Sequence, residues 1–350
     1  MDSLFFNLKE SMMEREKKYY SLNYLILIIL VLSVFSCQQT GQQQSNRIIC
    51  LTPNHTEVVY ALGLQDDIVG WTQYCNYPPE VQDVPGWVRY DKYEFTGIEN
   101  ELKKKVAVVS SFVTVNYTLI DSLKPTLILT SHEMQRGIVK KLKDKGYNVM
   151  HFEPVTLDDT FEMMLEIGKA TGKLQTAEKL VKQYREEIED IKASTQNLPK
   201  IKVYFEINHM GPYVLGSGSP MDQMIEIAGG VNIFEDVEGE AFHADLKDIV
   251  ARDPDVILTP LWPAAGREEV TTTYEIVTRE GFSDITAVKN SRIYHYDSSL
   301  LKRPGPRSLP AIKKLAYLLH PYYFKNPEKS VDPWELGKID ENYPPPRALY

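Results

Sequence analysis

The sequence has 350 residues, a length that allows two lobes of ordinary domain size. Charged residues make up 25% of the chain and hydrophobic residues 43%, which is the balance of a globular protein and not of a disordered one. The net charge of −9 offers no basic surface to a nucleic-acid backbone, so nucleic acid is excluded as a partner.

The first 46 residues are typical of an export segment followed by a tether. Basic residues precede an apolar run over residues 24–35, which is too short to span a bilayer but suits a secretory signal. Residues 34–37 (VFSC) resemble a bacterial lipobox. We expect a lipoprotein signal peptide over residues 1–36, a lipid on Cys37, a flexible tether over residues 37–46, and a lipid-anchored location in the periplasm. An ordinary signal peptide or an uncleaved anchor is the alternative.

Apolar runs alternate with helical stretches in the next part of the chain. The runs cover residues 48–51, 68–71, 106–109, 126–129 and 148–152. Because helices separate these runs, the pattern predicts a mainly parallel sheet covered on both faces, in an N-terminal lobe over residues 47–157. Within this lobe, Asn54 is the expected N-cap of a helix, and Glu57 is expected to complete a capping box.

Residues 158–199 carry no strand signal and predict a helical spine. Apolar side chains recur there every three or four positions, as expected for one face of a long amphipathic helix, at Leu174, Ala177, Leu180, Tyr184, Ile188 and Ile191. A helix of this length between two α/β segments is expected to act as a stiff spine.

A second α/β lobe is expected over residues 200–324, followed by a Pro-rich tail over residues 325–350. Residues 120–130 (IDSLKPTLILT) resemble residues 249–259 (IVARDPDVILT), since each places a helix end, a proline and a buried strand in the same order. The predicted fold class is therefore α/β, with two Rossmann-like lobes of mainly parallel sheets joined by a long rigid backbone helix.

Open α/β sheets bind ligands beyond the carboxyl ends of their strands, so the loops that follow the predicted strands define the candidate site. Aromatic rings dominate these loops, with a few polar groups between them, and this suits a large, partly apolar ligand. The alternative is that some of these rings only pack the lobes. The candidate ligand-binding residues are Pro53, Asn54, Tyr74, Phe112, Ser131, Tyr213, Phe242, His243, Trp262 and Arg303.

Signatures of common enzymes and metal sites are missing from the sequence. It contains no Walker loop, no H-E-x-x-H and no G-x-S-x-G elbow, so we expect a protein that is not an enzyme. Three histidines, His132, His209 and His243, belong to the candidate loops, but no stand-alone metal site is expected from them. A single axial bond from a histidine to a metal held in a macrocycle is the alternative. Cys50 and Cys75 are expected to be buried or half-buried thiols, with a disulfide between them as the alternative.

Segments distributed along the chain together resemble one family of receptors. They are residues 51–57 (LTPNHTE), 68–71 (IVGW), 74–80 (YCNYPPE), 109–112 (VSSF), 122–125 (SLKP), 227–234 (IAGGVNIF) and 303–307 (RPGPR). In these segments the chain is similar to the helical-backbone periplasmic binding proteins, which serve importers of vitamin B12, ferric siderophores and haem. Its Tyr-x-x-Tyr-Pro-Pro loop most resembles the cobalamin receptors.

The resemblance implies a monomer that carries a corrinoid, has no resident cofactor, and delivers its ligand to an ABC permease and ATPase complex. Tyr74 would contact the corrin ring and Arg303 would supply a polar contact. The family's two docking carboxylates align with Thr118 and Lys247, so docking to the permease would differ here, with Asp121 and Asp248 as possible substitutes.

Three other functions remain open from the sequence. A ferric siderophore or haem is the second choice of ligand, because the same pocket chemistry suits any large chelate. A lipoprotein hydrolase on this fold would use Ser217 or Ser219 as nucleophile and His209 or His243 as base. A receptor without a transport role would fit the altered docking positions.

Overall fold

The computed structural model describes residues 46–78, 81, 106–207, 211–238, 241–262, 269–270 and 272–325. The predictions for the signal segment, Cys37, the tether, His209 and the Pro-rich tail fall outside these residues. Within the described ranges, no helix combines the length and the apolar character that crossing a bilayer requires.

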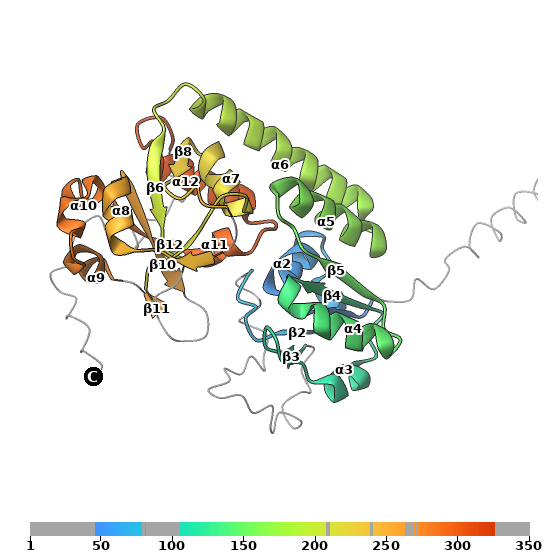
Figure 1. The fold of residues 1–350 in the computed structure, drawn as a ribbon. Helices are drawn as coiled ribbons and strands as arrows, with labels where there is room; N and C mark the ends of the chain where they lie inside the picture. Colours follow the sequence, from blue (N-terminus) through green and yellow to red (C-terminus); the bar gives the residue numbers. More distant parts are fainter. Residues whose placement is uncertain are drawn as a thin grey trace, which may run out of the picture. The chain divides into compact units, whose positions relative to one another are not determined.

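The N-terminal lobe holds a five-stranded, all-parallel sheet with the order β3-β2-β1-β4-β5 (Figure 1). Successive side chains of the central strand point to opposite faces: Ile48 and Cys50 pack with α2, whereas Ile49 packs with α3 and α4. Both faces are therefore apolar and covered. The elements are β1 (Ile48–Cys50), α2 (Pro53–Ala61), η1 (Gln65–Asp67), β2 (Ile68–Thr72), β3 (Ala107–Ser110), α3 (Tyr117–Leu123), β4 (Leu127–Ser131), η4 (Glu133–Gln135), α4 (Arg136–Asp144) and β5 (Val149–Phe152).

Two helices, α5 (Leu157–Ala170) and α6 (Leu174–Thr195), follow the first lobe and lie side by side (Figure 1). The predicted apolar stripe lies on α6. The sequence pattern predicts a single helical spine over residues 158–199 and does not separate α5 from α6. The chain turns between them at Gly172, whose φ of 73° suits glycine. Their close approach needs a second glycine, because a Cβ on Gly168 would lie 2.6 Å from the Cβ of Ala177.

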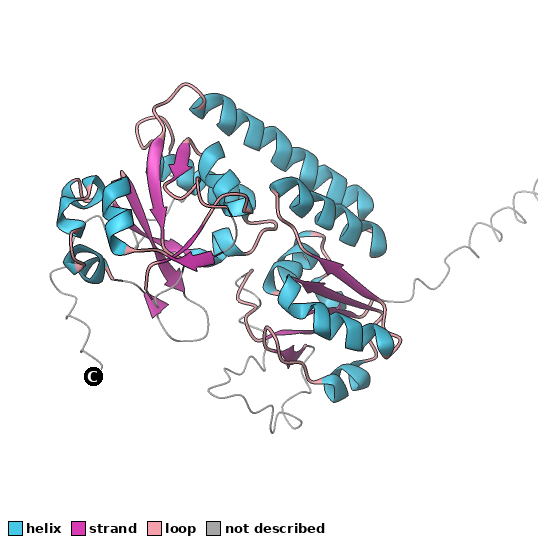
Figure 2. Cartoon of the chain, in the orientation of Figure 1, coloured by secondary structure: helices cyan, strands magenta, loops and turns pink. Residues whose placement is uncertain are grey.

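The C-terminal lobe has a second sheet, in which β6, β8, β10 and β12 are parallel and the short β11 runs antiparallel to the end of β10. The strands form separate groups in the two lobes (Figure 2), and the predicted α/β class with two mainly parallel sheets is confirmed. The elements are β6 (Ile201–Phe205), β7 (Tyr213–Leu215), α7 (Pro220–Ile227), β8 (Gly230–Asn232), β9 (Ala241–His243), α8 (Leu246–Arg252), β10 (Val256–Trp262), β11 (Glu269–Val270), α9 (Thr273–Thr278), η6 (Phe282–Asp284), α10 (Thr286–Lys289), β12 (Ile293–Asp297), α11 (Ser298–Lys302) and α12 (Ser308–Leu319).

The similarity between the two lobes extends to backbone conformation. Helices α3 and α8 each have seven residues and end in a left-handed residue that is not glycine, Lys124 with φ 47° and Asp253 with φ 46°. In each case a proline follows, and the residue before a proline is disfavoured in the helical region. The strands β4 and β10 then begin, so the repeated unit predicted from the sequence is also a structural repeat.

A short segment of the C-terminal lobe, residues 303–307, contacts the N-terminal lobe. The guanidinium of Arg307 donates to both oxygens of Glu57 in α2, from Nη2 to Oε1 at 2.6 Å and from Nε to Oε2 at 2.9 Å. The amide of Asn54 donates to the Pro304 carbonyl at 3.3 Å. These contacts join α2 to the loop before α12.

The expected capping box at the start of α2 is therefore wrong. Thr52 is the N-cap residue, without a side-chain cap bond, and Pro53 occupies the first helical turn, where no N–H is needed. Asn54 and Glu57 lie inside the helix, and both side chains turn to the other lobe. The tertiary partners Pro304 and Arg307 replace the local capping contacts that the sequence spacing suggested.

The Glu57–Arg307 pair is almost completely removed from water, with side-chain exposures of 1% and 6%. Burial raises the pKa of the Glu57 carboxyl, and the adjacent Arg307 opposes this shift. Burial acts to lower the pKa of Arg307, but the carboxylates of Glu57 and Asp297 outweigh it and leave that pKa raised. Paired charges in this environment are tolerated only because each satisfies the other.

We expect Glu57→Gln to lower the free energy of unfolding by about 3–5 kcal/mol, because the buried Arg307 would keep only its 3.5 Å contact with Asp297. Chemical denaturation measures the change. The double variant Glu57→Met/Arg307→Met should lose clearly less than the sum of the two single changes, since neither charge of the Glu57–Arg307 pair remains.

The matched control is Glu186→Gln, which breaks an exposed 3.8 Å pair with Lys182 and should cost at most about 1 kcal/mol. Fully additive losses in the double variant would show that the two side chains do not act as a pair.

Candidate ligand-binding cavity

A cavity of about 770 Å³ lies between the two lobes and is lined by residues of both. From the N-terminal lobe the lining residues are Thr52, Pro53, Asn54, Tyr74, Phe112, Ser131, His132, Glu133, Arg136, Glu153, Pro154 and Val155. From the C-terminal lobe they are Ile207, Leu215, Ser219, Pro220, Met221, Ser299, Leu301, Lys302, Arg303 and Pro304.

Every strand of the N-terminal sheet contributes to the cavity at its carboxyl end. Pro53 follows β1, Tyr74 follows β2, Phe112 follows β3, Ser131 ends β4, and Glu153 follows β5. Parallel strands place their carboxyl ends at one edge of a sheet, which is why residues distant in sequence meet here. The rule that selected the candidate loops therefore holds for the whole first lobe.

One buried side chain, Gln135, connects three of these strand ends. Its amide nitrogen donates to the Leu51 carbonyl at 3.1 Å and to the Phe112 carbonyl at 2.7 Å. Its amide oxygen accepts from the Ser131 backbone N–H at 3.2 Å. Gln135 is completely buried, and its bonds to Leu51 and Ser131 satisfy backbone groups that are buried with it. The loops after β1 and β3 and the end of β4 are thus held at fixed positions, and no sequence motif pointed to this residue.

His132 follows β4 directly and adopts an unusual backbone conformation, with φ 77° and ψ 140°. Such positive φ values are strained for a residue with a Cβ and persist where the surroundings impose them. Here the His132 N–H donates to the Phe152 carbonyl at 3.0 Å, and the His132 carbonyl accepts from the Gln135 N–H at 3.0 Å. The imidazole packs edge-on against the Phe112 ring, with centroids 5.3 Å apart.

A charged network forms part of the same wall. Arg136 donates to both oxygens of Glu153, with Nε 2.6 Å from Oε1, and His151 Nε2 lies 2.8 Å from Oε1. Hydrogen bonds from Arg136 and then from His151 lower the pKa of the Glu153 carboxyl to about 2. Glu153 therefore stays ionised, and it offsets the positive charge of Arg136 at the cavity.

The opposite wall comes from the start of α7 and from residues 301–304. Ser219 caps α7 by accepting from the Asp222 N–H at 3.1 Å, and Met221 lies in its first turn. Arg303 reaches across to the N-terminal lobe, where it donates to Asn76 Oδ1 at 2.6 Å. Burial lowers the pKa of Arg303. A mainly apolar surface that also carries Lys302 and the anchored Arg303 thus faces the N-terminal wall.

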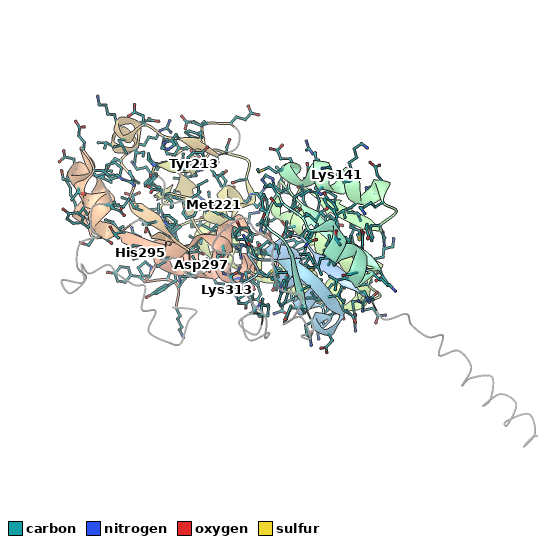
Figure 3. The ribbon with its side chains drawn as sticks, turned by 90° about the horizontal axis from the view of Figure 1, so that it is seen from below. Lys141, Tyr213, Met221, His295, Asp297 and Lys313 are labelled. Atoms are coloured by element: carbon teal, nitrogen blue, oxygen red, sulfur yellow. The ribbon has the colours of Figure 1, made fainter. Side chains whose placement is uncertain are left out.

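The structure brings six of the ten candidate residues to this cavity: Pro53, Asn54, Tyr74, Phe112, Ser131 and Arg303. Tyr213, Phe242 and His243 belong to the two-stranded antiparallel sheet of β7 and β9 and are not among the lining residues. The Tyr213 ring packs on His243 at 5.2 Å, and Phe242 packs on Phe234 at 5.4 Å. Figure 3 labels Tyr213 together with Met221, which does line the cavity from the same lobe. The Trp262 side chain is outside the described part.

The serines considered as nucleophiles have structural partners. Ser219 caps α7, and the Ser217 hydroxyl donates to the Val237 carbonyl at 3.4 Å. Within the described ranges, neither serine hydroxyl forms a hydrogen bond with a histidine. In that part of the chain, no group of three or more His, Cys, Asp or Glu side chains is arranged to hold a metal ion.

Cys50 and Cys75 are free and buried, as predicted. Burial raises the pKa of both thiols, that of Cys75 to about 12, so neither is a reactive thiolate at neutral pH. The Cys75 sulfur lies 3.1 Å from the Thr56 hydroxyl of α2.

The positions aligned with docking carboxylates, Thr118 and Lys247, are exposed on α3 and α8. The two substitutes considered from the sequence already have partners. Asp121 accepts from Lys145 at 3.0 Å and from Tyr147, and Asp248 accepts from Arg252 at 3.0 Å.

Two α/β lobes that enclose a cavity at their strand ends define a solute-binding protein with a cleft between its lobes. Residues 48–300 match the family described as periplasmic binding protein. The uncharacterized ABC transporter substrate-binding lipoprotein YvrC of Bacillus subtilis (strain 168) is 30% identical over 294 residues, which cover 82% of this chain and 83% of that protein. The chain belongs to the periplasmic binding protein family, which confirms the resemblance carried by its motifs.

Other relatives share the fold at lower identity. The vitamin B12-binding protein of Vibrio cholerae serotype O1 (strain M66-2) is 24% identical over 277 residues, covering 79% of this chain and 89% of that protein. The periplasmic heme-binding protein RhuT from Roseiflexus sp. RS-1 matches with a TM-score of 0.64 at 24% identity, over 79% and 98% of the two chains. The periplasmic vitamin B12 binding protein BtuF of Vibrio cholerae matches with a TM-score of 0.60 at 22% identity. The match covers 78% of this chain and 96% of that chain.

We expect Gln135→Met to lower the free energy of unfolding by about 2–4 kcal/mol, because it leaves two buried carbonyls and one buried N–H without their partner. Chemical denaturation measures the loss. Gln183→Met on the exposed face of α6 is the matched control and should change stability by at most about 0.5 kcal/mol. Equal stabilities for the two variants would show that Gln135 does not hold the loops.

Proposed function

We propose that this protein is the substrate-binding lipoprotein of an ABC importer and that it carries cobalamin or a related corrinoid between its lobes. The observation that supports this most strongly is the cavity of about 770 Å³ lined by strand-end residues of both lobes. That volume lies in the upper part of the range for small-molecule sites. The function is carriage, and no catalytic step is proposed.

The chemistry of the walls suits a broad ligand with an apolar body and a polar edge. Tyr74 and Phe112 offer ring faces or edges, and Leu215 and Met221 add apolar contact from the other lobe. Polar groups lie beside them, with Arg303 anchored on Asn76. A corrinoid combines a flat macrocycle with amide groups around its edge. The macrocycle suits the apolar and aromatic side chains of the cavity, and the amides suit its polar side chains.

Haem and ferric siderophores are the second candidates. The aromatic part of the lining, with Tyr74 and Phe112, is the observation that favours haem, because a flat macrocycle packs well on such rings. The names of relatives point to both ligand types, since one is a vitamin B12-binding protein and another a heme-binding protein. The binding experiment below separates them.

The permease and ATPase complex is the proposed partner, supported by the name of the relative from Bacillus subtilis. Docking through Asp121 or Asp248 would require these carboxylates to be shared with Lys145 and Arg252, which already contact them. We propose that the exposed Thr118 and Lys247 face the permease in place of a carboxylate pair.

We expect the purified protein to bind cyanocobalamin more tightly than haemin or a ferric siderophore, as measured by calorimetry or by quenching of intrinsic fluorescence. Tyr74→Ala and Phe112→Ala should each weaken binding about tenfold through lost ring contact. Tyr322→Ala changes a fully exposed ring outside the cavity and should leave affinity unchanged. An absence of corrinoid binding at micromolar concentrations would rule out the first choice of ligand.

We expect the full-length protein in a bacterial host to be recovered in the membrane fraction and to incorporate labelled fatty acid. Cys37→Ser should abolish incorporation, because only the thiol accepts the lipid. Cys50→Ser changes a thiol that is buried in the fold and should leave incorporation intact. Label retained by Cys37→Ser would show that the anchor lies elsewhere.

A further inference from the structure

The imidazole of His132 is held in one orientation at the cavity wall. Its Nδ1 accepts a hydrogen bond from the Met134 backbone N–H, with 3.2 Å between the two nitrogens. The ring also makes a T-shaped contact with Phe112. The backbone on either side is fixed by the bonds to Phe152 and Gln135. These contacts favour the orientation in which Nδ1 faces the Met134 N–H.

The Met134 bond determines where the proton of the neutral ring lies. A backbone N–H always donates, so Nδ1 must supply its lone pair, and in the neutral imidazole the proton is then on Nε2. Within the described ranges, His132 Nε2 has no hydrogen-bond partner, and the ring bonds only through Nδ1. This leaves one N–H donor at the cavity wall without a partner from the protein.

This arrangement is the reverse of that in a metal-binding histidine. A histidine that coordinates a metal usually donates an N–H from its second nitrogen to a carbonyl or carboxylate, which leaves the lone pair of the first free for the metal. In His132 the lone pair is used within the protein and the N–H is available. The ring is therefore suited to an oxygen acceptor and unsuited to an iron or cobalt centre.

We infer that His132 is a specificity residue that donates a hydrogen bond from Nε2 to an oxygen acceptor on the edge of the ligand, a carboxamide or carboxylate group, and does not act as an axial metal ligand. The inference rests on the proposed function, since it concerns the same cavity. In this role His132 selects ligands by the amide or acid groups on their periphery. The metal centre of the ligand forms no bond with His132.

The tautomer can be measured without any ligand. Long-range proton–nitrogen correlation spectra of the protein labelled at histidine nitrogen show which ring nitrogen carries the proton, and the His132→Gln variant identifies the signal that belongs to residue 132. The expected result is a proton on Nε2. A proton on Nδ1 would overturn the inference, whatever the protein binds.

The second test compares two variants with two corrinoids. His132→Phe keeps a ring beside Phe112 but removes the donor, and it should weaken both cyanocobalamin and aquocobalamin about tenfold. His132→Gln keeps an amide N–H and should stay within about threefold of the unmodified protein. Equal affinity of His132→Phe and the unmodified protein would overturn the donor role.

Aquocobalamin also reports directly on coordination, because its axial water can be exchanged for an imidazole. The expected result is that its visible spectrum does not change on binding. A spectral shift that His132→Phe abolishes would show axial ligation and overturn the inference. If the protein binds haemin and no corrinoid, the proposed ligand fails, and the same variants and spectra measured with haemin then test the donor role separately.

Discussion

The buried pair between Glu57 and Arg307 is the contact on which the geometry of the cavity depends. It joins the first helix of the N-terminal lobe to the loop before α12, two points 250 residues apart in the chain. Asn54 and Pro304, which line the cavity, lie on the same two segments and bond to each other. Separating a buried ion pair is unfavourable, because each partner would then be a buried charge without its counter-ion. The spacing of the two walls is set at this point.

The helix α6 supports the same segment from another direction. The Tyr184 hydroxyl donates to the Pro306 carbonyl at 2.7 Å, and Lys313 of α12 pairs with Glu187 of α6. The loop that carries Arg303 and Arg307 is thus held by α2 and by α6. This arrangement argues for a cleft that changes only modestly when a ligand enters, as is usual for preorganised binding sites.

The two walls of the cavity differ in the way they are ordered. The N-terminal wall is fixed by buried hydrogen bonds, with Gln135 holding two strand-end loops and the end of β4, and with Glu153 held ionised by Arg136 and His151. The C-terminal wall is mainly apolar, and its Arg303 is anchored on Asn76. We therefore expect hydrogen bonds to a ligand mostly from the first lobe. The second lobe is expected to contribute mainly apolar contact area. The strained backbone of His132 belongs to the directional wall, where its surroundings impose the conformation.

The sequence by itself determined the features that depend on local pattern. Alternating apolar runs predicted the parallel strands, the apolar stripe predicted α6, and the helix–proline–strand unit predicted the repeat that ends at Lys124 and Asp253. The strand-end rule placed Tyr74 and Phe112 correctly at one cavity, because all parallel strands of a sheet end at the same edge. Tertiary structure alone decided which polar side chains became partners. Glu57 has the spacing of a capping box yet pairs with Arg307, and Gln135 carries no signal in a single sequence. The small sheet of β7 and β9 also packs Tyr213 and Phe242 against neighbours in their own lobe. Spacing along a chain reports only on neighbours within a few turns, whereas these contacts depend on where distant segments meet in space.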